Sequence, residues 1–267
     1  MRRFTHTFPQ RISAFLLCLA LCLACVPVTA LAKDDHHDHN GWTPLTVNTI
    51  KEDGTLDPGQ YYLSKDVTYT GSNSIMITGT VTLCLKGHVL DLGGENITID
   101  NGGALTLCDC TSGTTQGYLD SDGLWRAGSS TDSTESPCDL TGGVITGGHG
   151  YAPKSVTFGG GVYVRNGTFT MEGGNIAGNT SAEGYGGGVY VSNENNFTMN
   201  GGSITGNSAT EDGGGVYVSS YSAFIMNDGS IADNTAIYGG GVSLWDDGCT
   251  FTMNGGSITG NQAAYGG

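Results

Sequence analysis

The chain has few basic residues, and they are confined to its first part. Its 267 residues include 10 Lys and Arg against 25 Asp and Glu, which gives a formal net charge of −15. No Lys or Arg follows Arg165. Because a negative surface repels nucleic acids and anionic lipids, we expect no nucleic-acid partner, and no polyanionic ligand along the part that follows Arg165.

Proline is also scarce, with 6 residues, whereas glycine is abundant, with 46. Glycine at this level is typical either of disorder or of a backbone that turns at fixed intervals. Glycine triplets begin at Gly159, Gly186, Gly213 and Gly239, at nearly equal intervals. The regular spacing of these internal repeats indicates a turning backbone rather than disorder.

No repeat contains the apolar spacing of an amphipathic helix. Apolar residues instead alternate with small or polar ones, as in the segments Val-Tyr-Val after Gly161 and Phe-Thr-Met from Phe169. This alternation is the two-residue period of a half-buried strand. Turn-forming Gly, Asn, Ser and acidic residues separate the alternating segments. We therefore predict three short strands in each repeat, the third centred on Ile176 in the first copy.

Strands this short cannot bury an apolar face alone, so the equivalent strands of successive repeats must stack. We predict an all-β fold, a right-handed parallel β-helix with three short strands per coil of about 27 residues. Stacking would place like side chains in columns about 4.8 Å apart. The expected columns are Phe169, Phe197, Phe224 and Phe251; Met171, Met199, Met226 and Met253; Val164, Val191, Val218 and Leu244; and a hydrogen-bonded ladder of Asn179, Asn207, Asn234 and Asn261. We also expect the third glycine of each triplet to adopt a conformation that a Cβ would forbid.

The first residues are typical of an exported protein. A basic start, an apolar run and the small residues Ala30-Leu31-Ala32 predict a signal peptide over residues 1–32. An uncleaved membrane anchor and a lipid-modified Cys25 are the alternatives. We expect the mature chain to have no stable membrane span and to be extracellular or attached to the cell surface.

The rest of the chain divides into four parts in our interpretation. A His- and Asp-rich linker covers residues 33–41, an N-terminal cap covers 42–70 and the β-helix covers 71–267. A loop insertion at 111–137 interrupts the β-helix, and the regular repeats occupy 159–267. Because the sequence stops within a further glycine triplet, we expect it to be truncated at its C-terminus.

Several segments resemble known repeat families. GQYYLSKDVTYT from Gly59, VTLCLKGHVLDLGG from Val81 and ALTLCDC from Ala104 are similar to the leading coils of pectin-lyase-like right-handed parallel β-helix proteins of bacterial surfaces. ITGNSATEDGGGVYV from Ile204 also resembles the repeats of polymorphic outer-membrane proteins. The resemblance implies the β-helix fold. It implies less about function, since the family mixes adhesins, polysaccharide lyases and glycosidases.

The uniform repeats predict a non-catalytic, adhesin-like surface protein that binds glycans or host-surface molecules and needs no cofactor. The segment around His149, Gly-His-Gly, resembles an element of polygalacturonase-type hydrolases, but the paired carboxylates of those enzymes are missing before it. We therefore predict no catalytic residue. The alternatives are an extracellular polysaccharide lyase or glycoside hydrolase, and an architectural stalk. Cell-wall or outer-membrane anchoring would require a missing C-terminal part.

A row of tyrosines is the candidate ligand-binding site. The alternating register turns Tyr163, Tyr190 and Tyr217 outward at a spacing close to the rise of a glycan chain. Such a row either stacks on sugars or stiffens the face of the sheet.

Two further sets of side chains suggest metal or disulfide chemistry. His36, His37 and His39 lie in the acidic linker and are candidate ligands for Zn²⁺ or Ni²⁺, the alternative being a solvated linker. Five cysteines follow the expected cleavage site, so at least one lacks a partner within the chain. Cys110 and Cys138 bracket the insertion and are the candidate disulfide pair. Cys84 and Cys108, at matching positions of adjacent coils, are close enough to be the alternative pair, although side chains that point side by side would oppose that bond.

Overall fold

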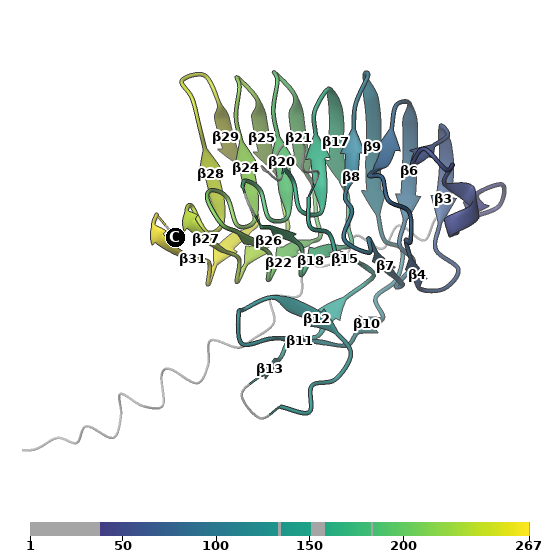
Figure 1. Ribbon diagram of the computed structural model, residues 1–267, viewed down its shortest axis with the longest axis horizontal. Coiled ribbons are helices and arrows are strands. Elements are labelled where there is room, and N and C mark those ends of the chain that lie inside the picture. The colour runs from purple at the N-terminus through teal and green to yellow at the C-terminus, as the bar shows by residue number, and fades with distance from the viewer. Residues whose placement is uncertain (1–37, 133–134, 151–157, 183, 267) are drawn as a thin grey trace, which may run out of the picture.

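The computed structural model describes residues 38–132, 135–150, 158–182 and 184–266, and these residues are nearly all in β-strands, turns and loops. Three long parallel sheets extend along the molecule (Figure 1). The only helix among the described residues is one 3-10 turn, η1 (Val47–Thr49). The signal-peptide prediction and the histidines His36 and His37 lie outside the described residues.

The first sheet, sheet A, has eight strands. They are β1 (Thr43–Pro44), β3 (Gly59–Tyr62), β6 (Thr80–Cys84), β9 (Gly103–Cys108), β17 (Gly167–Met171), β21 (Asn196–Met199), β25 (Ala223–Met226) and β29 (Thr250–Met253).

Sheets B and C have seven strands each. Sheet B contains β2 (Thr55–Leu56), β5 (Ile75–Ile77), β8 (Ile97–Ile99), β16 (Val162–Val164), β20 (Val189–Val191), β24 (Val216–Val218) and β28 (Val242–Leu244). Sheet C contains β4 (Val67–Thr68), β7 (Val89–Asp91), β15 (Val144–Thr146), β18 (Asn175–Ala177), β22 (Ser203–Thr205), β26 (Ser230–Ala232) and β30 (Ser257–Thr259).

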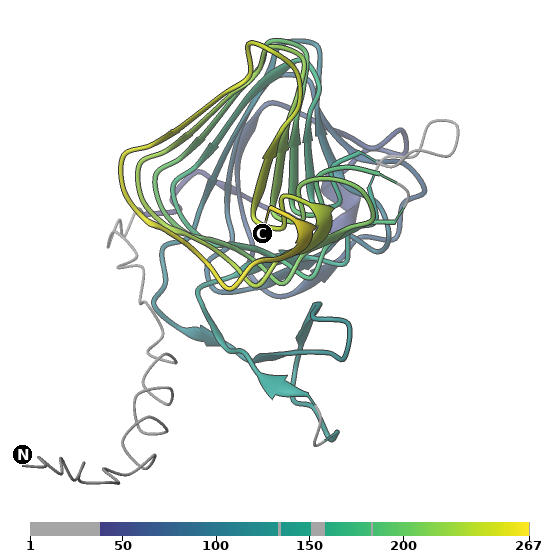
Figure 2. The ribbon, with the colours of Figure 1, turned by 90° about the vertical axis from the view of Figure 1, so that its left-hand side faces the viewer.

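The chain passes in turn through sheets B, A and C, and we call one such passage a coil. Each strand pairs in parallel with the equivalent strands of the neighbouring coils. Viewed along the stack, the coils lie one behind another (Figure 2). The prediction of an all-β chain with many short strands in parallel sheets is confirmed, and the arrangement is compatible with a β-helix-like solenoid.

The predicted columns of like side chains are also confirmed. The strand register aligns Phe169, Phe197, Phe224 and Phe251. Successive ring centroids in this column lie 4.8, 4.7 and 4.9 Å apart. The methionine and valine columns follow the same register. In the earlier coils Leu105 and Val81 continue the phenylalanine column, so one apolar core runs through both parts of the stack.

The asparagine ladder lies inside the stack as predicted. Asn179 Nδ2 donates to Asn207 Oδ1 (3.0 Å), Asn207 Nδ2 to Asn234 Oδ1 (2.9 Å) and Asn234 Nδ2 to Asn261 Oδ1 (2.9 Å). Each of these acceptor oxygens also receives the backbone N–H of the preceding asparagine, and each Nδ2 donates to a backbone carbonyl. The amides are therefore buried with their hydrogen-bonding capacity used, which is the condition for a stabilising polar network.

One expectation about the glycine triplets is wrong. The first glycine of each triplet, not the third, has a positive φ, +59° at Gly159 and +68° at Gly186. The third glycine is required for a different reason. A Cβ on Gly161 would lie 2.9 Å from both Gly188 O and Ile176 Cγ2, so close packing between coils excludes a side chain there.

The later coils contain a fourth short strand that the sequence did not predict. Sheet D consists of β19 (Thr180–Ser181), β23 (Ser208–Ala209), β27 (Thr235–Tyr238) and β31 (Gln262–Tyr265). These short segments lie in stretches rich in turn residues, which hid them. Among the described residues the early coils lack this strand, and they are shorter. Their sheet B strands, β2, β5 and β8, begin closer together in sequence than β16, β20 and β24 do.

The segment predicted as a cap, 42–70, supplies strands to all three sheets. Strands β1 and β3 belong to sheet A, β2 to sheet B and β4 to sheet C. The insertion leaves the stack after β9 and returns at β15, as Figure 1 shows below the main sheets. It forms antiparallel strands: β10 (Thr114–Thr115) with β14 (Leu140–Thr141), and β11 (Gly117–Leu119) with β12 (Trp125–Ala127) and β13 (Ser136–Pro137). The fully buried Trp125 anchors it against Val144 and Ala177 of sheet C.

Candidate functional site

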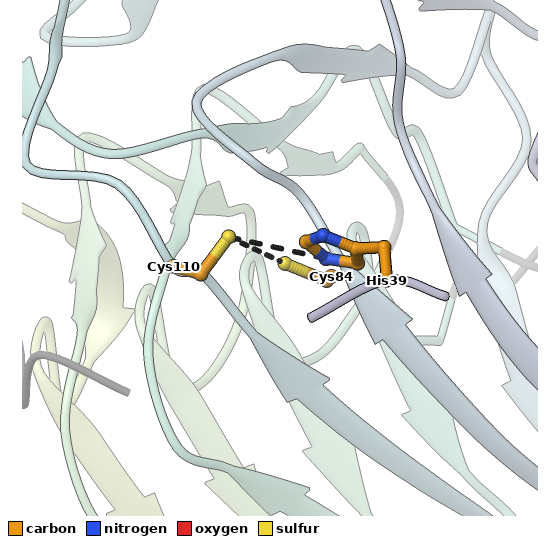
Figure 3. Close-up of side chains that lie close together, drawn as sticks. All are labelled: His39, Cys84 and Cys110. Atoms are coloured by element: carbon orange, nitrogen blue, oxygen red, sulfur yellow. Dashed lines mark hydrogen bonds between the residues drawn. The ribbon is translucent and has the colours of Figure 1, made fainter. Parts of the chain in front are cut away.

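Three potential metal ligands from distant parts of the sequence meet beside sheet A. They are His39, which precedes β1, Cys84 at the end of β6, and Cys110, which follows β9. Cys110 Sγ lies 3.5 Å from Cys84 Sγ and 3.9 Å from His39 Nε2 (Figure 3). The three ligand atoms all lie within 4.8 Å of one another. We call these residues the Cys-His cluster.

The strand alternation places Cys84 in the cluster. Val81, Leu83 and Leu85 belong to the core of the stack, so Cys84, between two of them, points to the other face of sheet A. The register sets it between Tyr62 of β3 and Cys108 of β9. Cys84 is nevertheless fully buried, because the N-terminal segment lies over this face.

Aromatic packing holds His39 over this face. Its ring packs against Tyr62 with centroids 4.9 Å apart and meets Trp42 edge-on at 5.0 Å. The backbone N–H of Trp42 donates to the carbonyl of His39 (3.0 Å), which closes a turn. Strand β1 then pairs with β3. His39 therefore belongs to a turn fixed to the first strands of sheet A, although the sequence placed it in a linker.

Asp109 fixes the chain on which Cys110 lies. Its carboxylate accepts backbone N–H bonds from Thr111 (2.8 Å), Gly87 (3.0 Å) and Gly143 (2.6 Å). These donors belong to the same turn, to the preceding coil and to the chain that returns from the insertion. Cys110 is thus held where three segments meet.

The environment keeps both thiols of the cluster protonated at neutral pH in the absence of a ligand. A hydrogen bond with Cys108, together with burial, raises the pKa of Cys84 far above its ordinary value. Burial raises the pKa of Cys110 to about 12. Because the thiolate is the nucleophile, neither residue is suited to covalent catalysis. Two thiols and an imidazole can instead bind a zinc-type ion, and the two sulfurs can form a disulfide on oxidation.

The structure describes Cys110 and Cys138 as free thiols in different surroundings, so the disulfide between them stays a prediction that this arrangement disfavours. Cys110 faces Cys84, whereas Cys138 packs in the insertion against the Trp125 cluster. The prediction rested on the insertion being one loop closed at its ends, whereas Cys110 lies beside sheet A and Cys138 lies within the insertion. Of the three predicted metal ligands, only His39 lies among the described residues, and the structure brings it to two cysteines that the sequence argument had not linked to it.

The tyrosine column is far less exposed than predicted. The rings of Tyr163, Tyr190 and Tyr217 lie one above another outside the main core, with successive centroids 5.0 and 5.1 Å apart. The exposed fractions of these residues are only 8, 8 and 4 %, respectively. Phe158 and Tyr185 cover them and complete a separate aromatic cluster. They form no open platform. Ligand binding by these three residues stays a prediction, which the burial of their rings disfavours.

Hydrogen bonds also tie the tyrosine hydroxyls into the fold. Tyr190 Oη lies 2.9 Å from Ser219 Oγ, and Ser192 Oγ donates to Tyr163 Oη (3.3 Å). Burial raises the pKa of Tyr190 to about 12, so its phenol stays neutral at any physiological pH. These contacts suit a structural column.

The buried carboxylates of the described residues are Asp109 and Asp212, and both have structural partners. Asp109 binds the three backbone N–H groups described above. Asp212 Oδ1 accepts a hydrogen bond from Ser243 Oγ (2.9 Å), and burial raises its pKa. His149, in the segment similar to hydrolases, is exposed. Neither of these two buried acids is therefore free to act as an acid or base in glycoside hydrolysis.

Comparison with protein-family models, with curated proteins and with solved structures finds no match to this chain. Within the described residues, no helix has the length and apolar character needed to cross a membrane.

Proposed function

We propose that the chain is an exported, non-catalytic repeat protein, a right-handed parallel β-helix of the pectin-lyase-like kind that acts outside the cell or on its surface and binds glycans. The basic and apolar residues at the start of the chain support export. The one-to-one register of successive coils supports the β-helix. The structural roles of Asp109 and Asp212 support a non-catalytic function.

The glycan-binding proposal rests on exposed aromatic side chains on neighbouring turns. Tyr221 is 68 % exposed on the turn that joins sheet B to sheet A. Trp245 is 57 % exposed on the equivalent turn of the last described coil, whereas Ser219, at the aligned position one coil earlier, is only 4 % exposed beneath the coil that follows it, so Tyr221 carries the proposal. The turns are in contact: the Ser220 N–H donates to Asp246 Oδ2 (3.3 Å), and Gly248 lies against the Tyr221 ring. Aromatic rings with an exposed face are suited to stacking on sugar rings.

The backbone at Tyr221 is strained. Ser220 and Tyr221 have φ values of +54° and +60°, in the left-handed region that L-residues with a Cβ disfavour. Asn193 and Glu194 adopt the same conformation one coil earlier, with φ values of +62° and +63°. Asn193 aligns with Ser220 and Glu194 with Tyr221, so the same turn recurs in both coils, at a cost of about 1 kcal/mol or more for a residue such as tyrosine. The exposure of the Tyr221 ring, rather than the shared strain, is therefore what marks it as a candidate for a functional role.

The charges around Tyr221 and Trp245 limit the class of glycan that could bind. Asp246 and Asp247 follow Trp245 directly, Glu194 lies on the turn one coil before Tyr221, and no Lys or Arg follows Arg165. Carboxylates accept hydrogen bonds from sugar hydroxyls and repel uronates and sulfated sugars. The proposed ligands are therefore neutral or amino-sugar glycans.

An immobilised glycan array probed with the full chain tests this proposal. We expect retention on neutral or amino-sugar glycans and about a tenfold loss of affinity in each of Tyr221→Ala and Trp245→Ala, because each removes one stacking ring. Tyr190→Phe is the matched control, since it alters a covered tyrosine and should bind as the unchanged protein does. Absence of retention on every glycan, or full binding by both alanine variants, would contradict the proposal.

A further inference from the structure

We propose that the Cys-His cluster binds one soft or borderline metal ion of the Zn²⁺ type, and that this ion fastens the N-terminal segment to the first coils of the stack. The inference is independent of glycan binding, because the cluster lies at the opposite end of the stack from Tyr221 and Trp245.

The spacing of the ligand atoms fits a bound zinc ion. Zinc binds thiolate sulfur at about 2.3 Å and imidazole nitrogen at about 2.0–2.1 Å in a tetrahedral arrangement, so two of its ligand atoms stand roughly 3.4–3.8 Å apart. The Cys110 Sγ to Cys84 Sγ distance is 3.5 Å and the Cys110 Sγ to His39 Nε2 distance is 3.9 Å. Only small side-chain shifts are needed to enclose an ion.

The three ligands are also held in place before any ion binds. The register of β3, β6 and β9 fixes Cys84, the three N–H bonds to Asp109 fix the turn of Cys110, and Tyr62 with Trp42 orients the His39 ring. Rigid supports of this kind lower the entropic cost of assembling a ligand set. The three ligands come from well-separated segments of the sequence, so an ion would join parts of the chain that unfolding separates.

Cys108 is a candidate for the fourth ligand. It lies directly opposite Cys84 on the neighbouring strand, but its thiol bonds to the Leu83 carbonyl (3.6 Å) and lies outside the group of ligand atoms within 4.8 Å of one another, so it would have to turn toward the ion. Either Cys108 or a water completes a four-coordinate site. Each cysteine that binds gives up its thiol proton to solvent, so the ion replaces at least two protons and no oxidant or reductant is required.

A disulfide between Cys84 and Cys110 is the competing chemistry, and it excludes the metal because both thiolates are consumed. A disulfide does not explain the imidazole nitrogen beside the two sulfurs. Thiolate and imidazole together form the donor set that Zn²⁺ and Cu⁺ prefer. The presence of His39 is therefore what favours the metal.

The test uses the full chain, purified under reducing conditions and titrated with Zn²⁺ alone, with Co²⁺ as a spectroscopic probe and Cu⁺ as a second arm. We expect one Zn²⁺ per chain, a sulfur-to-cobalt charge-transfer band with Co²⁺, and a rise in Tm when Zn²⁺ is added. Tight binding of Cu⁺ with little binding of Zn²⁺ would support the same donor set and assign it to a softer ion.

His39→Ala is the main variant, because His39 lies at the edge of the fold and its loss leaves the stack intact. It should weaken Zn²⁺ binding at least ~100-fold and abolish the rise in Tm. Cys110→Ser should do the same and remove most of the charge-transfer band. The matched controls, His149→Ala and Cys249→Ser, should bind as the unchanged chain does.

Three outcomes would overturn the proposal. The first is a reduced chain that binds neither Zn²⁺ nor Cu⁺. The second is binding that His39→Ala leaves unchanged. The third is peptide mapping of the exported protein that finds Cys84 and Cys110 joined as a disulfide.

Discussion

The first coils and the later repeats share one strand register but differ in what they place on it. From Thr55 to Cys108 the core columns contain mainly Val, Leu and Ile, with Tyr61 at one position, the coils are shorter, and two cysteines lie at strand ends. From Val162 onward the columns contain Phe, Met and Val, a fourth strand is added, and a ladder of asparagines runs through the interior.

This difference distinguishes the part of the chain that serves as a scaffold from the part that brings reactive side chains together. Where every coil repeats the last, like groups meet like groups, and stacking and hydrogen bonding use up their capacity. Where the coils are irregular, unlike groups meet, as His39 meets Cys84 and Cys110. The regular part offers ligands only what its turns expose, while the irregular part can build a site against the sheet itself.

A substitution in the phenylalanine column should lower the stability of the fold more than the other changes proposed below. Phe197 lies between two stacked rings and is fully buried, so Phe197→Ala should lower the free energy of unfolding by about 3–5 kcal/mol. Leu105→Ala, at the same column position in the early part, should cost about 2–4 kcal/mol, since it removes a smaller side chain and no ring stacking. Urea denaturation measures both. If Leu105→Ala lowers the free energy of unfolding more than Phe197→Ala does, the stacked rings do not make the later core the more stabilising of the two.

The buried asparagine ladder can be compared with a similar ladder on the exposed face. Asn207→Ala removes the acceptor for the backbone and side-chain donors of Asn179 in a buried site, and should cost about 2–4 kcal/mol. Asn227 belongs to a second ladder on the exposed face, with Asn200 and Asn254. Asn227→Ala should cost less than about 1 kcal/mol because water replaces its partners. Equal losses in thermal or urea unfolding would show that burial does not distinguish the ladders.

The smallest effect concerns one acid in each region. Burial raises the pKa of Glu95 in the early part and of Asp212 in the later part. A raised carboxyl pKa in the folded state adds stability below the unfolded-state pKa, and this contribution is lost as the pH rises through the folded-state value. The stability of the unchanged chain relative to Asp212→Asn, and relative to Glu95→Gln, should therefore fall as the pH is raised from below the ordinary pKa values of 3.8 and 4.5 toward neutrality.

Urea denaturation at a series of pH values measures both differences. A relative stability that is constant, or that increases with pH, would contradict the assigned direction for that acid.

The regular repeats were predictable almost residue by residue, because equivalent residues of successive sequence copies show directly which positions of neighbouring strands pair. Identical spacing from Phe169 to Phe197 and from Asn179 to Asn207 left one alignment of neighbouring strands. The fourth strand was missed because a pair of residues such as Thr180 and Ser181 carries no period. The exposure of the tyrosine column was also misjudged, because Phe158 and Tyr185, which directly precede two of the glycine triplets and pair in register, cover it.

The sequence by itself determined the all-β character, the parallel alignment of the repeats and the columns of like side chains, because alternation and copying constrain each strand locally. Only the tertiary structure decided which unlike residues meet. Cys110 contacts Cys84 rather than Cys138, and His39 joins them, because a returning chain and an N-terminal turn fold over the outer face of sheet A. Such contacts depend on the paths of irregular segments, which no periodicity specifies.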